Sequence, residues 1–303
     1  MVAVFGHRGA RGLLPENSLA GFALADQLRL TGVEFDVGLT ADSIPVVHHD
    51  PRLNPDYTRD QYGNYVGPGE PLIRDLTYQQ LVAYDVGQIQ PGTAYAARFP
   101  TQKPQAGTRI PKLDDVLTCC AGLDLLVEVK TFPDHPADTM PPKALAEATI
   151  QCLRAHDLID QTVLYAFDWR VLDAAAIIEP RLRRCCLTEP DTVKNPLLWF
   201  GKASLENFHP EQPGCVPEIV ASTGAKVWAP DFTTLNQYEV EQAHRLGLCV
   251  IPWTVNETTD IQNMLDLGVD GIISDWPDRV LDILSEKSLS PALPGFISRQ
   301  CSL

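Results

Sequence analysis

Short apolar runs alternate with helix-like segments along almost the whole chain, and this alternation constrains the fold more than any other feature of the sequence. Nine runs have the apolar and β-branched character of strands: residues 2–6, 33–37, 44–48, 125–129, 163–167, 184–188, 226–229, 249–253 and 271–274. Helices are expected at residues 18–30, 113–120, 143–156, 169–179, 236–246, 259–267 and 277–285, with a short one at 78–84. Strands that alternate with helices predict βα units and a parallel sheet.

The number of strands exceeds the eight that a closed (β/α)8 barrel needs, and one short connection explains the excess. Only GLTADS, residues 38–43, separates the second run from the third, whereas a parallel crossover needs about a dozen residues or more. These two strands should therefore form an antiparallel hairpin. A turn centred on Ala41 and Asp42 would place His49 roughly opposite Glu34. We predict an α/β fold, a (β/α)8 TIM barrel with a hairpin extension after the second strand.

One long segment, residues 52–109, fits neither the strand nor the helix pattern well, because Pro, Gly, Asn and Tyr interrupt it often. Connections of this length in compact domains are usually functional. We therefore expect an insertion that caps the barrel mouth, within a single barrel domain at residues 1–285. The remaining residues, 286–303, are expected to form a frayed C-terminal tail.

Charge and hydropathy exclude several kinds of partner. The net charge is −15 and the chain has no basic run, which argues against nucleic acid and anionic lipid surfaces. No run of about 18 apolar residues occurs, so no integral membrane segment is expected. The start of the chain lacks the pattern of a secretory signal, which predicts a cytoplasmic protein, or a periplasmic or secreted one if a signal peptide has been removed. The eight cysteines show no zinc-site spacing and are expected to be reduced. The oligomeric state stays open.

Polar and aromatic side chains gather at the ends of the expected strands, where catalytic residues of barrels lie. In chain order these residues are His7, Arg8, Glu34, Asp36, His49, Glu128, Lys130, Phe167 and Trp253. Glu34 and Asp36 are two residues apart and share a face, and Glu128 can meet them across the mouth. Three carboxylates in a confined site would not all stay ionised without a cation. Oxygen ligands suit Mg²⁺ or Ca²⁺.

Six short motifs stand at these positions in one order. They are HRG…PEN (residues 7–9 and 15–17), ExD (Glu34, Asp36), HD (His49, Asp50), ExK (Glu128, Lys130), WTVN (253–256) and DGIISD (270–275). In these motifs the chain resembles the glycerophosphodiester phosphodiesterase family over about residues 4–280. The resemblance implies a barrel hydrolase that cleaves small-molecule glycerophosphodiesters into sn-glycerol 3-phosphate and an alcohol with the help of a divalent metal.

The resemblance also implies roles for individual residues. Glu34, Asp36 and Glu128 would be the metal ligands, and His7 and His49 would be the acid/base pair. Arg8 and Lys130 would contact the phosphate. Phe167 and Trp253 are expected to form an apolar wall for the glycerol carbons. The chain departs from the family at Ala166, where a serine is frequent, and at Ser18, where threonine is usual. His48 precedes His49, and since neighbours on a strand face opposite ways, only one of the two should reach the site.

The sequence leaves the details of the reaction open. An in-line displacement could use water as the nucleophile, or the glycerol 2-hydroxyl through a cyclic phosphate. One alternative function is a lysophospholipase D-like activity on single-chain lipids, for which an apolar slot would be formed by aromatic residues of the insertion: Tyr57, Tyr62, Tyr65, Tyr95 and Phe99. A second alternative is a barrel that binds phosphodiesters without catalysis.

Overall fold

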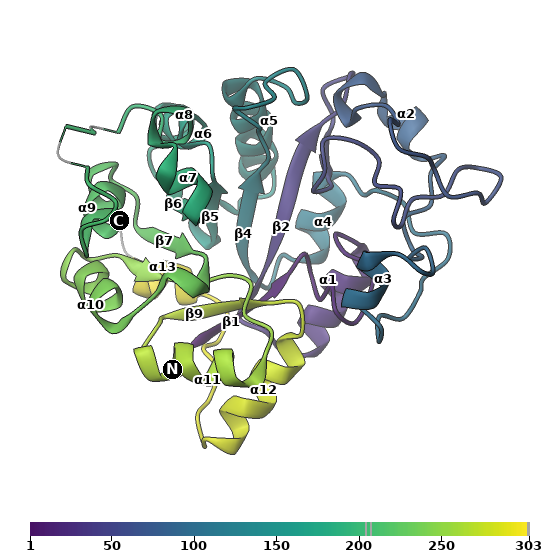
Figure 1. Ribbon diagram of the computed structural model, residues 1–303. Coiled ribbons are helices and arrows are strands. Elements are labelled where there is room, and N and C mark those ends of the chain that lie inside the picture. The colour runs from purple at the N-terminus through teal and green to yellow at the C-terminus, as the bar shows by residue number, and fades with distance from the viewer. Residues whose placement is uncertain (204, 207, 302–303) are drawn as a thin grey trace.

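Parallel strands form a nearly closed barrel in the computed structural model, which describes residues 1–203, 205–206 and 208–301 (Figure 1). The strands are β1 (Ala3–His7), β2 (Gly32–Leu39), β3 (Pro45–Val47), β4 (Asp124–Val129), β5 (Thr162–Ala166), β6 (Arg183–Thr188), β7 (Val227–Pro230), β8 (Cys249–Val250) and β9 (Gly271–Ser274). Their order is β8-β7-β6-β5-β4-β2-β1-β9, with β3 beside β2. Asp270 N donates to Val250 O (3.0 Å) and Ile273 N donates to Pro252 O (3.1 Å), which links β9 back to β8. The predicted (β/α)8 barrel is confirmed.

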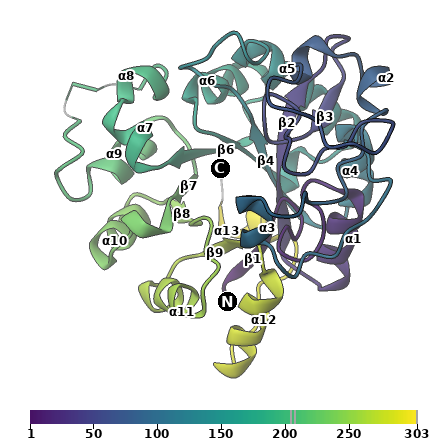
Figure 2. The same ribbon diagram turned by 45° about the vertical axis from the view of Figure 1, so that its right-hand side comes forward.

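Helices surround this barrel on the outside (Figure 2). They are α1 (Leu19–Gln27), α2 (Tyr78–Leu81), α3 (Ala94–Arg98), α4 (Leu113–Cys119), α5 (Pro142–Ala155), α6 (Trp169–Ile178), α7 (Pro190–Lys194), α8 (Pro196–Trp199), α9 (Cys215–Ser222), α10 (Gln237–Arg245), α11 (Thr258–Leu267), α12 (Pro277–Glu286) and α13 (Phe296–Gln300). The side chains of Ser18 and Asp168 cap α1 and α6 by accepting a bond from a first-turn backbone N–H. The expected helices lie where predicted, with ends displaced by a few residues.

Among the described residues, three helices between β6 and β7 were not predicted, and the longest of them is α9. α9 is eight residues long and carries Pro217 in its first turn. A proline there costs little, because the first N–H groups of a helix have no partner within the helix. Its short length and its proline conceal the helical period in the sequence. The helix buries Ile219 and Val220 against the barrel and completes the crossover between two parallel strands.

The hairpin of β2 and β3 is confirmed, but its predicted register is wrong by one residue. Val37 pairs with Val47, and His48 N donates to Asp36 O (2.9 Å), so this register continues toward Phe35 for His49, and not toward Glu34 as predicted. The turn has three residues between Thr40 and Ile44, and its last residue, Ser43, has a left-handed backbone (φ 59°). A left-handed residue at this position is usual for three-residue hairpin loops, which centres the turn on Asp42.

Up to residue 301, where the described residues end, the C-terminal tail packs against the barrel, so the expectation that this part is frayed is wrong. Phe296 and Ile297 of α13 are buried among apolar side chains from the interior of the barrel. The Asp124 carboxylate at the start of β4 accepts bonds from Gly295 N (2.8 Å) and Ile297 N (3.0 Å). The tail therefore covers the N-terminal ends of the strands, opposite the rim where the predicted site lies.

Residues 52–109 form a small apolar cluster of their own, which includes Tyr57, Leu81 and Val86. From this cluster α3 reaches the barrel, where the Phe99 ring packs 5.6 Å from the ring of Trp276. The division into barrel, insertion and tail stays a prediction. In the part of the chain that the structure describes, every helix is too short or too polar to cross a membrane.

Candidate active site

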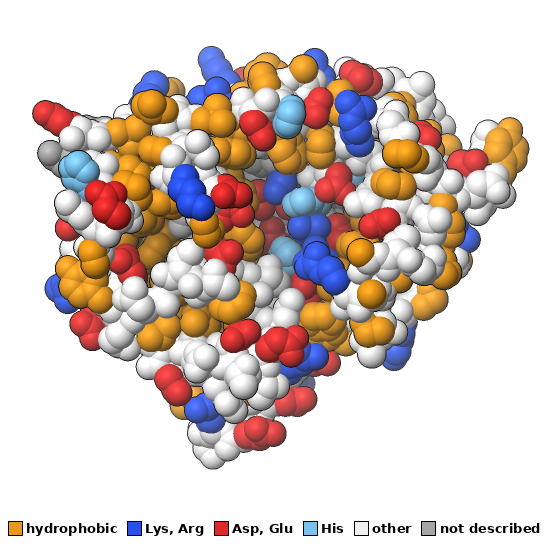
Figure 3. Space-filling model, in the orientation of Figure 1, with side chains coloured by type: hydrophobic (Ala, Val, Ile, Leu, Met, Phe, Trp, Pro, Cys, Tyr) orange, Lys and Arg blue, Asp and Glu red, His pale blue; other side chains and the backbone are white. Residues whose placement is uncertain are grey.

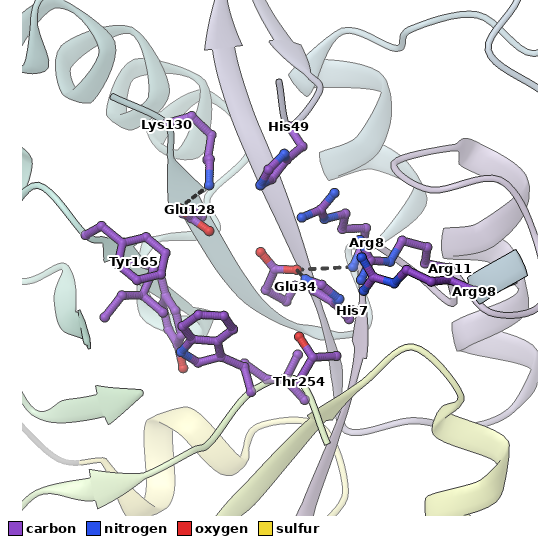
Figure 4. Close-up of a pocket in the computed structure, with 14 residues that line it drawn as sticks. His7, Arg8, Arg11, Glu34, His49, Arg98, Glu128, Lys130, Tyr165 and Thr254 are labelled. Carbon is purple, nitrogen blue, oxygen red and sulfur yellow. Dashed lines mark hydrogen bonds and ion pairs between the residues drawn. The ribbon is translucent and has the colours of Figure 1, made fainter. Parts of the chain in front are cut away.

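Three carboxylates meet at the C-terminal ends of two neighbouring strands. Glu34 and Asp36 stand on β2 and Glu128 stands on β4, and the parallel register pairs Asp36 with Glu128. One oxygen from each carboxylate lies within 4.8 Å of the others, and all three residues are buried. Figure 4 shows Glu34 and Glu128 pointing toward one another across the pocket. The fold thus brings together the three predicted residues, although Glu34 and Glu128 are 94 positions apart in sequence.

The charges of this cluster are only partly compensated. Burial, reinforced by the charges of Asp36 and Glu128, raises the pKa of Glu34 well above its ordinary value. Burial also raises the pKa of Glu128, although Lys130 opposes the shift. Asp36 differs: burial raises its pKa, but Arg8, His49, Lys130 and the Asn17 hydrogen bond together outweigh burial and lower the pKa. Oδ1 of Asp36 is buried without a hydrogen-bond partner among the described residues. An all-oxygen set with a free buried acceptor fits a hard divalent cation and could hold one.

Two cations lie against this cluster. Lys130 Nζ donates to Glu128 Oε1 (2.7 Å) and lies 3.8 Å from Asp36 Oδ1. Arg8 Nε lies 3.2 Å from Asp36 Oδ2, and the backbone N–H of Arg8 donates to Glu34 Oε2 (3.1 Å). Arg8 has a left-handed backbone (φ 49°) in the turn that follows β1. A side chain at Gly6 would clash with this turn, since its Cβ would lie 1.7 Å from Gly9 O.

His7 is held at the end of β1 by a carboxylate. Its Nδ1 lies 2.6 Å from Asp275 Oδ1, and its Nε2 lies 3.7 Å from Glu34 Oε2. Burial and the Arg11 guanidinium lower the pKa of His7 to about 4, although Asp275 opposes this shift. An ionised carboxylate only accepts hydrogen bonds, so Nδ1 of the neutral ring donates to Asp275. Nε2 is therefore the nitrogen that faces the acidic cluster with a free lone pair.

His49 is arranged in the same way on the opposite side of the pocket. Its Nδ1 lies 2.8 Å from Asp50 Oδ1, and burial, together with Arg8 and Lys130, lowers its pKa well below the ordinary value. The neighbouring His48 turns away, with Nε2 3.2 Å from Arg52 O and its ring 6.3 Å from that of Tyr57. Only His49 reaches the cavity that holds the acidic cluster, in agreement with the prediction that one of the two histidines would do so.

These groups surround a cavity of about 210 Å³ that opens on the face shown in Figure 3, where charged side chains and histidines gather in a central hollow. Phe167 and Trp253 form one wall, with ring centroids 5.3 Å apart in an edge-to-face arrangement. The full lining is His7, Arg8, Arg11, Glu34, His49, Arg98, Glu128, Lys130, Tyr165, Phe167, Leu187, Trp253, Thr254 and Ile273. Of the predicted site residues, only Asp36 lies beneath this surface, in contact with Arg8 and Lys130.

Several residues that support the site received no role from the sequence. Arg11 makes two bonds to Asp275, from Nε to Oδ1 (2.8 Å) and from Nη2 to Oδ2 (3.0 Å). Glu16 accepts from Arg8 Nη1 (2.8 Å), and Asn17 Nδ2 donates to Asp36 Oδ2 (3.0 Å). The sequence did contain a signal that Asp275 belongs to the site, because Asp275 directly follows the last strand, just as Arg8 directly follows the first. Glu16 and Asn17 belong to the PEN motif, whose spacing alone does not reveal its contacts.

A barrel whose rim combines buried carboxylates, neutral histidines and cations around one small cavity belongs among the enzymes that hydrolyse phosphoric diesters. Comparison with known sequences narrows this class, because the sequence model of the "Glycerophosphoryl diester phosphodiesterase family" matches residues 7–279. The chain therefore belongs to that family, whose enzymes hydrolyse glycerophosphodiesters. The resemblance noted in the sequence is confirmed, and the alternative of a barrel without catalysis is set aside.

Individual relatives agree with this assignment. A crystal structure from Silicibacter pomeroyi DSS-3, which bears the name of this family as a provisional assignment, is 36% identical, with 96% of each chain covered and a TM-score of 0.86. A glycerophosphodiester phosphodiesterase from Caldanaerobacter subterraneus is 26% identical, covering 93% of this chain and 97% of its own. An Oleispira antarctica phosphodiesterase, solved with the product sn-glycerol-3-phosphate, is 20% identical with a TM-score of 0.69, covering 93% of this chain and 96% of its own, and shares the fold.

Proposed function

We propose that this protein hydrolyses glycerophosphodiesters to sn-glycerol 3-phosphate and an alcohol, with Mg²⁺ or Ca²⁺ held by Glu34, Asp36 and Glu128. The observation that carries the proposal is this buried carboxylate cluster, which opens into a small cavity beside two histidines. The Oleispira relative was solved with sn-glycerol-3-phosphate as its product, which agrees with the proposed product. A bound ion would neutralise the negative charge of the phosphate as the transition state forms.

Arg8 and Lys130 would bind the phosphate oxygens from two sides. Both side chains contact carboxylates of the cluster, at 3.2 Å for Arg8 and 2.7 Å for Lys130. These contacts fix their positions before substrate arrives, so little reorganisation is needed when charge builds up on the phosphate. Burial lowers the pKa of Lys130, but the charges of Glu128 and Asp36 outweigh it and raise the pKa above its ordinary value, so the side chain stays cationic.

His7 and His49 would move the protons. Each ring is neutral near pH 7, and each has Nδ1 engaged by a carboxylate, so each presents Nε2 for proton transfer. One Nε2 accepts the proton of the attacking oxygen, from water or from the glycerol 2-hydroxyl. The other ring donates a proton to the departing alcohol, and the negative phosphate of a bound substrate raises its pKa toward that of an effective acid.

The Phe167–Trp253 wall would hold the glycerol carbons. Trp253 Nε1 donates to Ala229 O (2.9 Å), which fixes the indole, and the Phe167 ring lies edge-to-face against it. Ala166 is buried in β5 and offers no hydroxyl at this wall. The wall therefore acts through apolar contact and shape, and the polar recognition of substrate falls to the charged residues on the other side.

The proposal is tested by measuring release of glycerol 3-phosphate from glycerophosphocholine and glycerophosphoglycerol. We expect a chelator to lower the rate by orders of magnitude, with recovery on addition of Mg²⁺ or Ca²⁺. His7→Ala should lower kcat by about 10²-fold or more, since it removes a general acid or base. A matched control is His156→Ala, on the outer helix α5, which should keep the wild-type rate. Unchanged rates after chelation would contradict the metal role of the cluster.

A substrate comparison that measures choline release separates the lysophospholipase D-like alternative, because the acylated substrate would yield a lysophosphatidate and no free glycerol 3-phosphate. None of the aromatic residues suggested for an acyl slot, Tyr57, Tyr62, Tyr65, Tyr95 and Phe99, lines the cavity that holds the acidic cluster. Tyr65 and Phe99 instead line a separate cavity of about 360 Å³. We therefore expect faster turnover of glycerophosphocholine than of its acylated form.

A further inference from the structure

One cation in the cavity comes from outside the barrel. Arg98 is the last residue of α3, and it is the one described residue of the segment 52–109 that lines the cavity with the acidic cluster. Figure 4 shows it beside Arg11 at the edge of the pocket. Nothing in the proposed reaction uses this side chain, since Arg8 and Lys130 already serve the phosphate.

Arg98 differs from the other cations of the cavity because its charge is not compensated. Arg8, Arg11 and Lys130 each have a carboxylate oxygen within 3 Å, at 2.8, 2.8 and 2.7 Å. Within residues 1–203, 205–206 and 208–301, the guanidinium of Arg98 has no ion pair or hydrogen bond, and its recorded contact is the Phe99 ring at 5.3 Å. The side chain is exposed, so its donors are available to a ligand in the cavity.

The backbone that carries Arg98 is nevertheless held in place. Tyr95, one turn earlier on α3, donates from its hydroxyl to Glu16, the same carboxylate that contacts Arg8. Phe99 is buried, packs against Trp276, and lies 4.8 Å below the Arg11 guanidinium. The anchored backbone keeps the free donors of this guanidinium at the edge of the cavity, where they can bind the oxygen atoms of a ligand.

The position of Arg98 indicates which part of the substrate it meets. The phosphate lies at the acidic cluster and the glycerol lies along the aromatic wall in the proposed complex. In Figure 4, Tyr165 lies on one side of Glu34, whereas Arg98 lies on the other. A phosphodiester has two arms, so the second arm, the alcohol that departs, extends toward Arg98. This arm is the part that varies among glycerophosphodiesters.

We propose that Arg98 is a specificity-determining residue that selects substrates by the chemistry of this alcohol. A guanidinium forms charge-assisted bonds with hydroxyl or carboxylate oxygens, and it repels a quaternary ammonium group. The enzyme therefore prefers glycerophosphodiesters whose alcohol carries oxygen acceptors, such as a second glycerol, over those whose alcohol is a cation, such as choline. This inference rests on the proposed function.

The test compares kcat/KM for glycerophosphoglycerol and glycerophosphocholine. Arg98→Gln should lower the ratio of the two values about tenfold, which corresponds to one charge-assisted hydrogen bond. Arg98→Glu should lower the ratio further by attracting choline. Arg98→Lys keeps the charge and should retain most of the preference. Arg245→Gln, an equal change of charge on the exposed face of α10, is the matched control and should leave both values unchanged.

The outcomes separate the two proposals. If wild type cleaves both substrates and their ratio stays the same in Arg98→Gln and Arg98→Glu, the inference fails while the proposed function stands. An equal loss of kcat/KM for both substrates also overturns the inference, because Arg98 would then act on the phosphate that both substrates share, or on the fold. If wild type cleaves neither substrate, the proposed function fails and the inference fails with it.

Discussion

Carboxylates hold the two histidines of the site in the same way, although they come from unrelated positions. Asp275 follows β9 and binds Nδ1 of His7, and Asp50 directly follows His49 and binds its Nδ1. Each carboxylate fixes the tautomer of its ring and leaves Nε2 toward the cavity. Asp50 is fixed in turn by Asn54, whose Nδ2 donates to Oδ2 (2.6 Å). Orientation of the rings thus depends on residues that need not touch the substrate.

Replacement of the carboxylate at His49 tests this dependence. Asp50→Asn keeps the shape of the side chain but offers an amide that can present its N–H₂ to Nδ1, which favours the wrong tautomer. We expect kcat for glycerol 3-phosphate release to fall about 10- to 100-fold with a smaller change in KM. Asp134→Asn, in the exposed loop after Lys130, serves as the control. A kcat equal to that of wild type would show that Asp50 does not orient the ring.

The sequence predicted the residues of the site that stand on strands or within three residues of a strand end, and it missed those placed by the longer path of a loop. Glu34, Asp36 and Glu128 follow from strand periodicity and from the rule that barrel sites lie at strand ends. Arg11 could not be placed in this way, because its contact with Asp275 depends on the path of the turn after β1. The position of Arg98 depends on how the whole segment 52–109 folds back on the barrel, and local patterns carry no information about such a contact.

At the scale of elements, the unexpected feature is that α13 closes the bottom of the barrel. The barrel interior at that end is apolar, with Ala3 and Val163 among its buried side chains, and it needs a cover. The five residues of α13 are too few to show a helical period. The sequence of the tail therefore gave no sign of a helix. The hairpin shows the same limit, because a left-handed Ser43 set the register and composition did not.

Removal of one side chain of α13 tests whether this cover stabilises the fold. Phe296 is 5% exposed, and Phe296→Ala should lower the free energy of unfolding by about 3–5 kcal/mol through lost burial and the cavity left behind. Urea denaturation measures this change, and Leu293→Ala, at a position that is 68% exposed, is the control. Since the site lies at the other end of the barrel, kcat/KM under native conditions should stay close to wild type. Equal stabilities of the two variants would show that the tail packs only loosely.

For the whole molecule, the acidic cluster couples metal binding to stability. Glu34 and Glu128 have raised pKa values in the metal-free protein, so the folded chain retains protons that the unfolded chain loses as pH rises above their ordinary range. The metal-free protein therefore loses stability as pH increases through those raised values. Asp36 has a lowered pKa, so its contribution to stability is present at neutral pH and is lost only as the pH falls below the ordinary range of an aspartate. A bound cation reverses this pH dependence of stability, because Glu34 and Glu128 must be ionised to bind it.

This coupling predicts that metal stabilises the protein more at pH 8 than at pH 5.5. At saturating Ca²⁺ or Mg²⁺, each tenfold gain in affinity adds about 1.4 kcal/mol to the free energy of unfolding. Thermal unfolding with and without metal at both pH values measures the increment in Tm. Glu34→Gln removes one ligand and one of the raised pKa values, so both the increment and its pH dependence should shrink. An increment that is equal at the two pH values would contradict proton release from the cluster, because Glu34 and Glu128, on the neighbouring strands β2 and β4, must both be ionised to hold the ion.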